Sequence, residues 1–79
     1  MTDDRESIFE RISNHRDFID KRYNRVGFKG LDKTLRLTIL AEEFGETARA
    51  VLEHDRANLE DELYDVAQVV VAWLETIDD

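Results

Sequence analysis

Five acidic residues occur at spacings that place them together on helices. Glu42, Glu43 and Glu46 lie in one segment, and Glu62 and Asp65 lie in the next. Successive residues of an α-helix are rotated by about 100°, so Glu46 falls about 40° and Glu43 about 100° from Glu42. Glu62 and Asp65 are three residues apart and therefore share one helical face. Two successive helices would thus each present a group of carboxylates.

These carboxylates interrupt apolar stripes and do not lie on purely polar faces. Leu35 and Ile39 precede the first group on the same arc, and Val69 and Trp73 flank Asp65 on the helix that carries the second group. Like charges that are partly removed from water repel one another and lose hydration. Such a site must become protonated, stay hydrated, pair with basic residues or bind cations. Because the candidate ligands are oxygen atoms and the chain has no cysteine, the pattern favours Mg²⁺ or Mn²⁺.

Ordinary surface charge explains part of the same pattern. Acidic residues in the first turn of a helix, such as residues 60–62, are stabilised by the helix dipole. The other carboxylates have Arg36, Arg49 and Arg56 nearby for exposed ion pairs. Asp65 does not fit this interpretation, because it lies beyond the first turn in the middle of the apolar face. Spacing alone therefore leaves both interpretations open.

Three helices are needed to position these residues. Hydrophobic periodicity predicts them over residues 4–24, 33–53 and 59–77. Asp32 and Asn58 are the expected N-caps of the second and third helices, because their side chains can accept the unpaired amides of the first turn. The short polar connection between these two helices makes them antiparallel neighbours. The hairpin brings the two acidic groups level with each other.

The chain is expected to form a single all-α domain over residues 1–79 that completes its helical bundle by oligomerisation. The third helix is apolar around most of its circumference, so one hairpin partner and one further helix cannot cover it. A domain of 79 residues buries a modest core, and without cysteine it has no disulfide to add stability. We therefore expect a homodimer or homotetramer with the third helix near the interface.

Charge and hydropathy exclude two classes of partner. The formal net charge of −8 argues against nonspecific binding to DNA or RNA. No apolar run approaches the roughly 20 residues that a bilayer requires. The acidic N-terminal residues differ from a secretory signal or a transit peptide. We therefore expect a cytoplasmic protein without a nucleic-acid polymer or a membrane as partner.

The two acidic segments resemble the MazG-type, all-α NTP pyrophosphohydrolases. Their pattern is E-E-x-x-E on one helix and E-x-x-D on the next, which here corresponds to LAEEFGE at residues 40–46 and ELYDVA at residues 62–67. The resemblance covers about half of the chain. It implies Mg²⁺-dependent hydrolysis of a nucleoside triphosphate to the monophosphate and pyrophosphate, in a house-cleaning role for the nucleotide pool.

The resemblance also implies roles for the five acids. Glu43, Glu46, Glu62 and Asp65 would be the metal ligands. Glu42 would bind a further ion or orient the attacking water, so Glu42 and Glu43 are the catalytic candidates. The cation would offset phosphate charge and activate water, and a carboxylate within hydrogen-bond reach would take the proton.

Contacts to the substrate are less well defined. Many family members continue past the second acidic helix with residues that contact phosphates and base, whereas this sequence ends at Asp79. Phosphate contacts are therefore expected from basic residues near the glycine loop, above all Lys29, Lys33 and Arg36, or from another subunit. The alternative interpretation of these residues is solubilising charge. Neither His15 nor His54 is expected on the acidic face.

Aromatic residues offer base stacking, but packing in a core or interface is their more common role. The candidates are Tyr23, Phe28 and Trp73. Two further functions remain open from the sequence. One is a non-catalytic or regulatory helical oligomer that binds Mg²⁺ or nucleotide. The other is an acidic, antitoxin-like partner protein.

Overall fold

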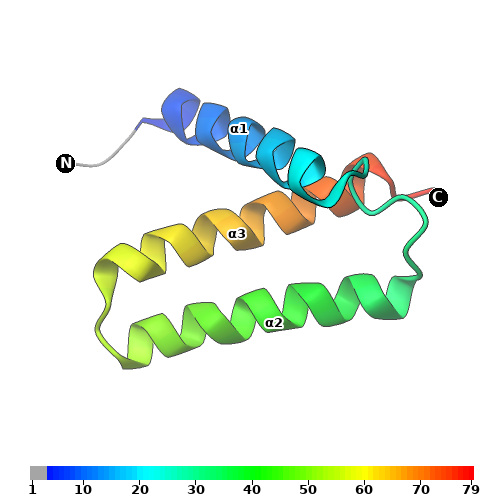
Figure 1. The fold of residues 1–79 in the computed structure, drawn as a ribbon. Helices are drawn as coiled ribbons and strands as arrows, with labels where there is room; N and C mark the ends of the chain where they lie inside the picture. Colours follow the sequence, from blue (N-terminus) through cyan, green and yellow to red (C-terminus); the bar gives the residue numbers. More distant parts are fainter. Residues whose placement is uncertain (1–3) are drawn as a thin grey trace.

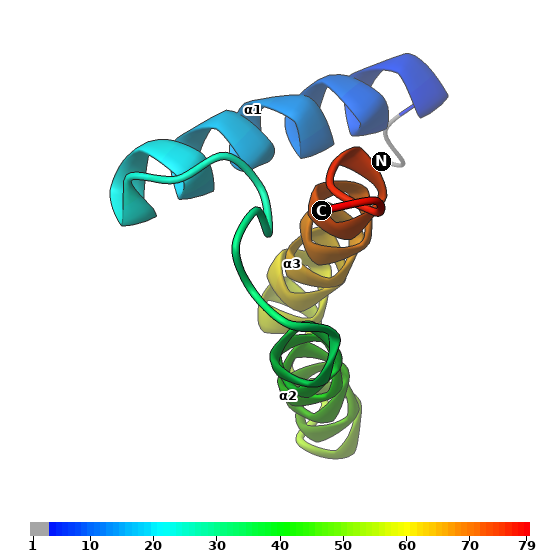
Figure 2. The same ribbon diagram turned by 90° about the vertical axis from the view of Figure 1, so that its right-hand side faces the viewer.

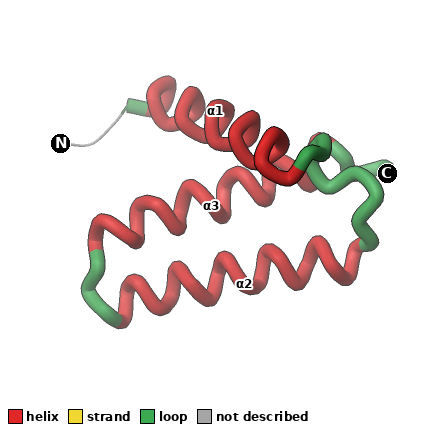
Figure 3. The backbone as a smooth tube through the Cα atoms, in the orientation of Figure 1, coloured by secondary structure: helices red, strands yellow, loops and turns green. Residues whose placement is uncertain are grey.

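The computed structural model describes residues 4–79, which form three helices and no strand. These are α1 (Arg5–Tyr23), α2 (Lys33–Leu52) and α3 (Arg56–Glu75) (Figures 1 and 3). Helices α2 and α3 run antiparallel and side by side, and α1 crosses the opposite side of α3 (Figure 2). The predicted all-α hairpin is therefore confirmed, while oligomerisation stays a prediction. None of the described helices has the length and apolar character needed to cross a membrane.

Each helix begins with an aspartate that caps its first turn. The side chains of Asp4, Asp32 and Asp55 each accept a hydrogen bond from the amide three residues further on, at 2.8 to 3.1 Å. The prediction of Asp32 is confirmed, but the prediction that Asn58 caps the third helix is wrong. Asn58 is already helical and donates its amide to Asp55. Helix α3 therefore begins three residues earlier than predicted and leaves a connection of residues 53–55.

Arg16 fixes α1 against the C-terminal half of α3. Its side chain is buried and donates to Glu75 at 2.7 Å, to Asp20 at 2.9 Å and to Gln68 at 3.3 Å. A buried guanidinium is tolerated only where carboxylates and other acceptors satisfy it, so this network fixes the position of α1. The network also determines where the neighbouring residue, His15, projects.

The connection between α1 and α2 is folded tightly against the end of α3. Gly27 has φ +52°, and a Cβ atom there would lie 3.1 Å from the carbonyl oxygen of Ala72 and from Cγ2 of Thr76. Phe28 follows with 1% exposure and donates its amide to the Thr76 hydroxyl at 3.3 Å. The glycine therefore permits the close approach that buries Phe28.

The hydrophobic core is small and lies beside this connection. Phe28, Val69 and Ala72 are its buried members, and Leu31, Ile39, Leu40 and Trp73 pack around them. Many large apolar side chains of the hairpin remain exposed. Their exposed fractions range from 40% to 79%, and they include Leu37, Phe44, Val51, Leu52, Leu63, Val70 and Leu74. A single copy of the chain thus leaves much of the apolar surface of α2 and α3 uncovered.

Candidate metal centre

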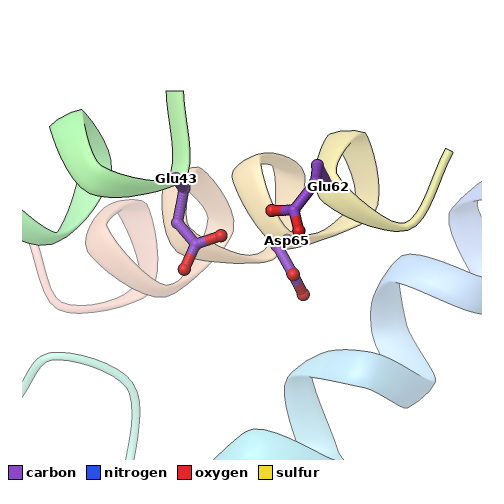
Figure 4. Close-up of side chains that lie close together, drawn as sticks. All are labelled: Glu43, Glu62 and Asp65. Atoms are coloured by element: carbon purple, nitrogen blue, oxygen red, sulfur yellow. The ribbon is translucent and has the colours of Figure 1, made fainter. Parts of the chain in front are cut away.

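Three carboxylates from the two hairpin helices converge at one point. Glu43 of α2 and Glu62 and Asp65 of α3 each offer an oxygen atom within 4.8 Å of the others (Figure 4). All three side chains are half-buried between the helices. The convergence follows from the short connection, which sets Glu43 opposite the second and third turns of α3. The alignment expected from helical spacing is present for these three residues.

Burial and mutual repulsion alter the acidity of this cluster. The pKa of Glu43 is raised from 4.5 to about 7, first by burial and then by the negative charges of Asp65, Glu46, Glu62 and Glu42, in that order of effect. The two helices thus hold a set of like charges that cannot all ionise without cost. A group whose pKa lies near neutrality can accept a proton at physiological pH.

Glu62 shows the same effect from the other helix. Its pKa is raised from 4.5 to about 7, first by burial, then by a hydrogen bond with the Glu46 side chain, and then by the negative charges of Glu46, Asp65 and Asp61. Glu46 itself is exposed and lies beside the three-residue cluster. Glu42 is also exposed, and its charge acts on Glu43. The structure therefore brings three of the five predicted acids into direct convergence and leaves Glu42 and Glu46 at the rim.

Two oxygen atoms of the cluster are buried and lack a hydrogen-bond partner within the described residues. They are Oε2 of Glu43 and Oε2 of Glu62. A buried polar atom without a partner is costly, so such atoms mark a place that a bound water or ion can fill. A divalent cation with a preference for oxygen ligands satisfies both atoms and neutralises the repulsion that raises both pKa values. The donor set therefore fits Mg²⁺ or Mn²⁺.

His15 contradicts the prediction made from the sequence. Its Nε2 atom lies 2.6 Å from Oδ1 of Asp65, so α1 reaches the acidic face that we expected to lack histidine. The error arises because helical spacing describes one helix at a time, whereas this contact depends on how α1 crosses α3. His54 lies in the connection between α2 and α3, as expected.

A model of the MazG nucleotide pyrophosphohydrolase domain matches residues 32–78. The chain belongs to the MazG family. The match covers more than half of the chain and includes both acidic helices, so the resemblance seen in the sequence is confirmed. No curated protein and no solved structure matches the chain. Helix α1 lies outside the matched residues of this MazG chain, so its contribution to the site has to come from the geometry.

Beside Asp65, the MazG chain has an open hollow of about 330 Å³ between α1 and α3. Its lining residues are Arg11, Asn14, His15, Asp61, Tyr64 and Asp65. The three from α1 recur at spacings of three and four residues, which is the sequence signal that could have revealed them. This hollow is the concave surface next to the carboxylates and is large enough for part of a small ligand.

Arg11 covers one wall of this hollow. Its guanidinium lies 4.0 Å above the ring of Tyr64 and forms ion pairs with Glu60 at 3.1 Å and Asp61 at 3.0 Å. These pairs are exposed and contribute little to stability. The guanidinium can therefore exchange its carboxylate partners for another anion at low energetic cost.

The predicted substrate-binding residues of this MazG chain lie away from the carboxylates. Lys29 and Lys33 are exposed at the far end of the hairpin, and Lys33 is about 15 Å from Glu43 along the axis of α2. Arg36 is 1% exposed and donates to the carbonyls of Leu31, Thr76 and Asp79 at 2.8, 2.7 and 3.4 Å. Its guanidinium thus holds the C-terminal residues, a structural role in place of the exposed position expected of a phosphate ligand.

The three aromatic candidates occupy different environments. Phe28 is a core residue and cannot stack on a base without leaving the core. Trp73 packs against the same core, although its Nε1 atom is buried without a partner among the described residues. Tyr23 is exposed, with the guanidinium of Arg25 at 5.0 Å from its ring. The packing role therefore accounts for Phe28 and Trp73.

Proposed function

We propose that this MazG-family chain hydrolyses a nucleoside triphosphate to the monophosphate and pyrophosphate with a bound Mg²⁺. Glu43, Glu62 and Asp65 would hold the cation, with Glu46 joining from the rim. The observation that carries the proposal is the convergence of three half-buried carboxylates, two of whose oxygens have no hydrogen-bond partner among residues 4–79. Mn²⁺ is the alternative cation because it accepts the same oxygen ligands.

The chemistry requires water to attack one phosphorus atom while the bridging bond between the α and β phosphates breaks. When bound, the cation would neutralise phosphate charge and polarise the phosphoryl oxygen. Glu42 lies next to Glu43 on α2 and is exposed, so its carboxylate can orient the attacking water and take its proton. Burial and the neighbouring carboxylates raise the pKa of Glu43, and a bound cation would stabilise its charged form. The carboxylates thus take up the proton that the attacking water releases, and pyrophosphate leaves as the second product.

We assign the phosphate contacts to Lys29 and Lys33 rather than to Arg36. Both lysines are exposed, whereas the guanidinium of Arg36 is occupied by backbone carbonyls. Because the lysines are far from Glu43, a single ligand can contact both the lysines and the carboxylate cluster only if it extends along α2. A second subunit that supplies the lysines removes this requirement.

We propose that a second copy of the chain covers the apolar surface of α2 and α3. The exposed side chains on these helices, including Leu52 at 79% and Phe44 at 69%, are the support for this proposal. Contiguous exposed apolar surface marks an interaction site. Size-exclusion chromatography with light scattering measures the molecular mass in solution, and we expect the mass of a dimer or tetramer. A stable monomer at micromolar concentration contradicts this proposal.

Pyrophosphate release tests the activity directly. We expect release from a panel of canonical and damaged nucleoside triphosphates with Mg²⁺ but not with EDTA. Glu43→Ala and Asp65→Ala should abolish it, while Glu10→Ala, an exposed acid of α1, should retain it. If nucleotide raises the melting temperature without any pyrophosphate release, the chain is a nucleotide-binding module and the proposed hydrolysis is wrong.

A further inference from the structure

Asp65 differs from the other two carboxylates of the cluster in having a hydrogen-bond partner on α1. Its Oδ1 atom lies 2.6 Å from Nε2 of His15. Glu43 and Glu62, in contrast, each retain a buried oxygen without a hydrogen bond among the described residues. The partner of Asp65 comes from α1, which lies outside the residues matched by the MazG domain.

The chemistry of the two groups determines the direction of this hydrogen bond. An ionised carboxylate has only acceptor atoms, so Nε2 of His15 must carry the hydrogen. The bond occupies Oδ1 and leaves the lone pairs of Oδ2 for a cation. Ligating carboxylates are commonly held in this way by a donor that fixes their orientation.

The backbone of α1 is well anchored at this point. The next residue, Arg16, is buried in the network with Glu75 and Asp20. The imidazole is itself confined, because it is half-buried and its ring stacks on Phe18 with a centroid separation of 6.3 Å. Because α1 and the imidazole are held in place, His15 can fix the orientation of the Asp65 carboxylate from outside the hairpin.

We propose that His15 is a positioning residue that holds Asp65 in the orientation needed to bind the cation. This inference rests on the proposed function, because it assigns the partner of one proposed metal ligand. It makes α1 part of the metal centre, although every proposed ligand lies on α2 and α3. His15 therefore couples the docking of α1 to cation affinity.

A matched pair of substitutions tests this role. His15→Gln keeps an amide N–H at about the reach of Nε2, whereas His15→Met has a similar length but no donor. Mn²⁺ binding is measured by calorimetry and by the electron paramagnetic resonance signal of the free ion. We expect His15→Met to weaken the affinity about tenfold or more and His15→Gln to restore most of it. His54→Asn, in the α2–α3 connection, should bind as the wild type does.

Three outcomes overturn the positioning role. They are unchanged affinity in His15→Met, equal weakening in both variants, and tighter binding in His15→Met, which would make the imidazole a competitor of the cation. Failure of the wild-type chain to bind Mn²⁺ overturns the proposed function instead.

A second measurement needs no variant. Long-range ¹H–¹⁵N spectra of the wild-type chain report which imidazole nitrogen is protonated. We expect a proton on Nε2 of His15 both with and without Mg²⁺. An unprotonated Nε2 overturns the inference.

Discussion

Asp65 on α3 is the neighbouring charge with the largest effect on the pKa of Glu43 on α2. The two residues are 22 positions apart in the sequence and meet because the hairpin is antiparallel. Their repulsion adds to the effect of burial, which alone disfavours the charged form of Glu43. The fold therefore holds a strained set of charges, and this strain makes the stability depend on pH and on cations.

The stability of the metal-free chain should fall as the pH rises. Glu43 and Glu62 have an ordinary pKa of 4.5 and a value of about 7 in the fold. Between these values the folded chain binds more protons than the unfolded chain, so the free energy of unfolding decreases with pH. Thermal melts in EDTA should show a falling melting temperature across this range. Saturating Mg²⁺ should reduce the fall, and an equal slope with and without Mg²⁺ would contradict a cation site at these carboxylates.

Glu43→Gln should stabilise the metal-free chain and remove much of its response to Mg²⁺. The amide carries no charge, so the repulsion from Asp65 and Glu46 is lost. Because the side chain keeps some contact with solvent, we expect a gain of about 1 kcal/mol, which is a rise of about 4–8 °C in the melting temperature. Glu10→Gln is the control and should change stability by no more than about 0.5 kcal/mol. Equal Mg²⁺-induced shifts in wild type and Glu43→Gln would exclude Glu43 as a ligand.

The hairpin and its convergent acids were accessible from the sequence because both depend on local rules. Periodicity defined α2 and α3, and their short connection fixed the register closely enough to set Glu43 against Glu62 and Asp65. The roles of these acids in metal binding and catalysis stay predictions. The helix boundary at Asp55 was missed because Asp55 and Asn58 are both good N-cap residues.

The contribution of α1 was not accessible in the same way. Its angle to α3 depends on a connection that packs through Gly27 and on the buried network of Arg16. Neither feature follows from helical periodicity, so the contact between His15 and Asp65 was missed. The burial of Arg36 was missed for a similar reason, because its acceptors are carbonyls that only the tertiary fold brings together.

The cap of α3 offers a direct test of the corrected helix boundary. Asp55→Ala removes the acceptor for the amide of Asn58 and should cost about 1 kcal/mol. Asn58→Ala lies inside the first turn and should change stability much less. Urea titrations give the free energy of unfolding of each variant. A larger loss of unfolding free energy for Asn58→Ala than for Asp55→Ala would indicate that Asn58 is the N-cap, as first predicted.

Alanine substitutions at the three glycines distinguish the cost of a steric clash from the cost of backbone strain. Gly27→Ala should cost about 1–3 kcal/mol or more, because it has φ +52° and its Cβ would lie 3.1 Å from the carbonyl oxygen of Ala72. Gly30→Ala has φ +84° but open space, so it should cost only the conformational term of about 1–2 kcal/mol. Gly45→Ala, inside α2 with open space, should stabilise by about 0.5–1 kcal/mol. Thermal melts rank the variants, and equal losses for Gly27→Ala and Gly30→Ala would show that the clash is relieved.

Arg36 and Lys33 were both expected from the sequence to bind phosphate, but the structure predicts different phenotypes for their variants. Arg36→Met removes the donor to the carbonyls of Leu31 and Thr76 and should cost about 2 kcal/mol or more, which lowers the melting temperature by about 8 °C or more. Lys33→Met, the matched change at an exposed position, should leave the melting temperature within a few degrees and raise the KM for the nucleotide. Melts and steady-state kinetics on both variants separate the two roles. If Arg36→Met melts as the wild type does while its KM rises, Arg36 is a substrate ligand and its hydrogen bonds to the C-terminal residues are dispensable.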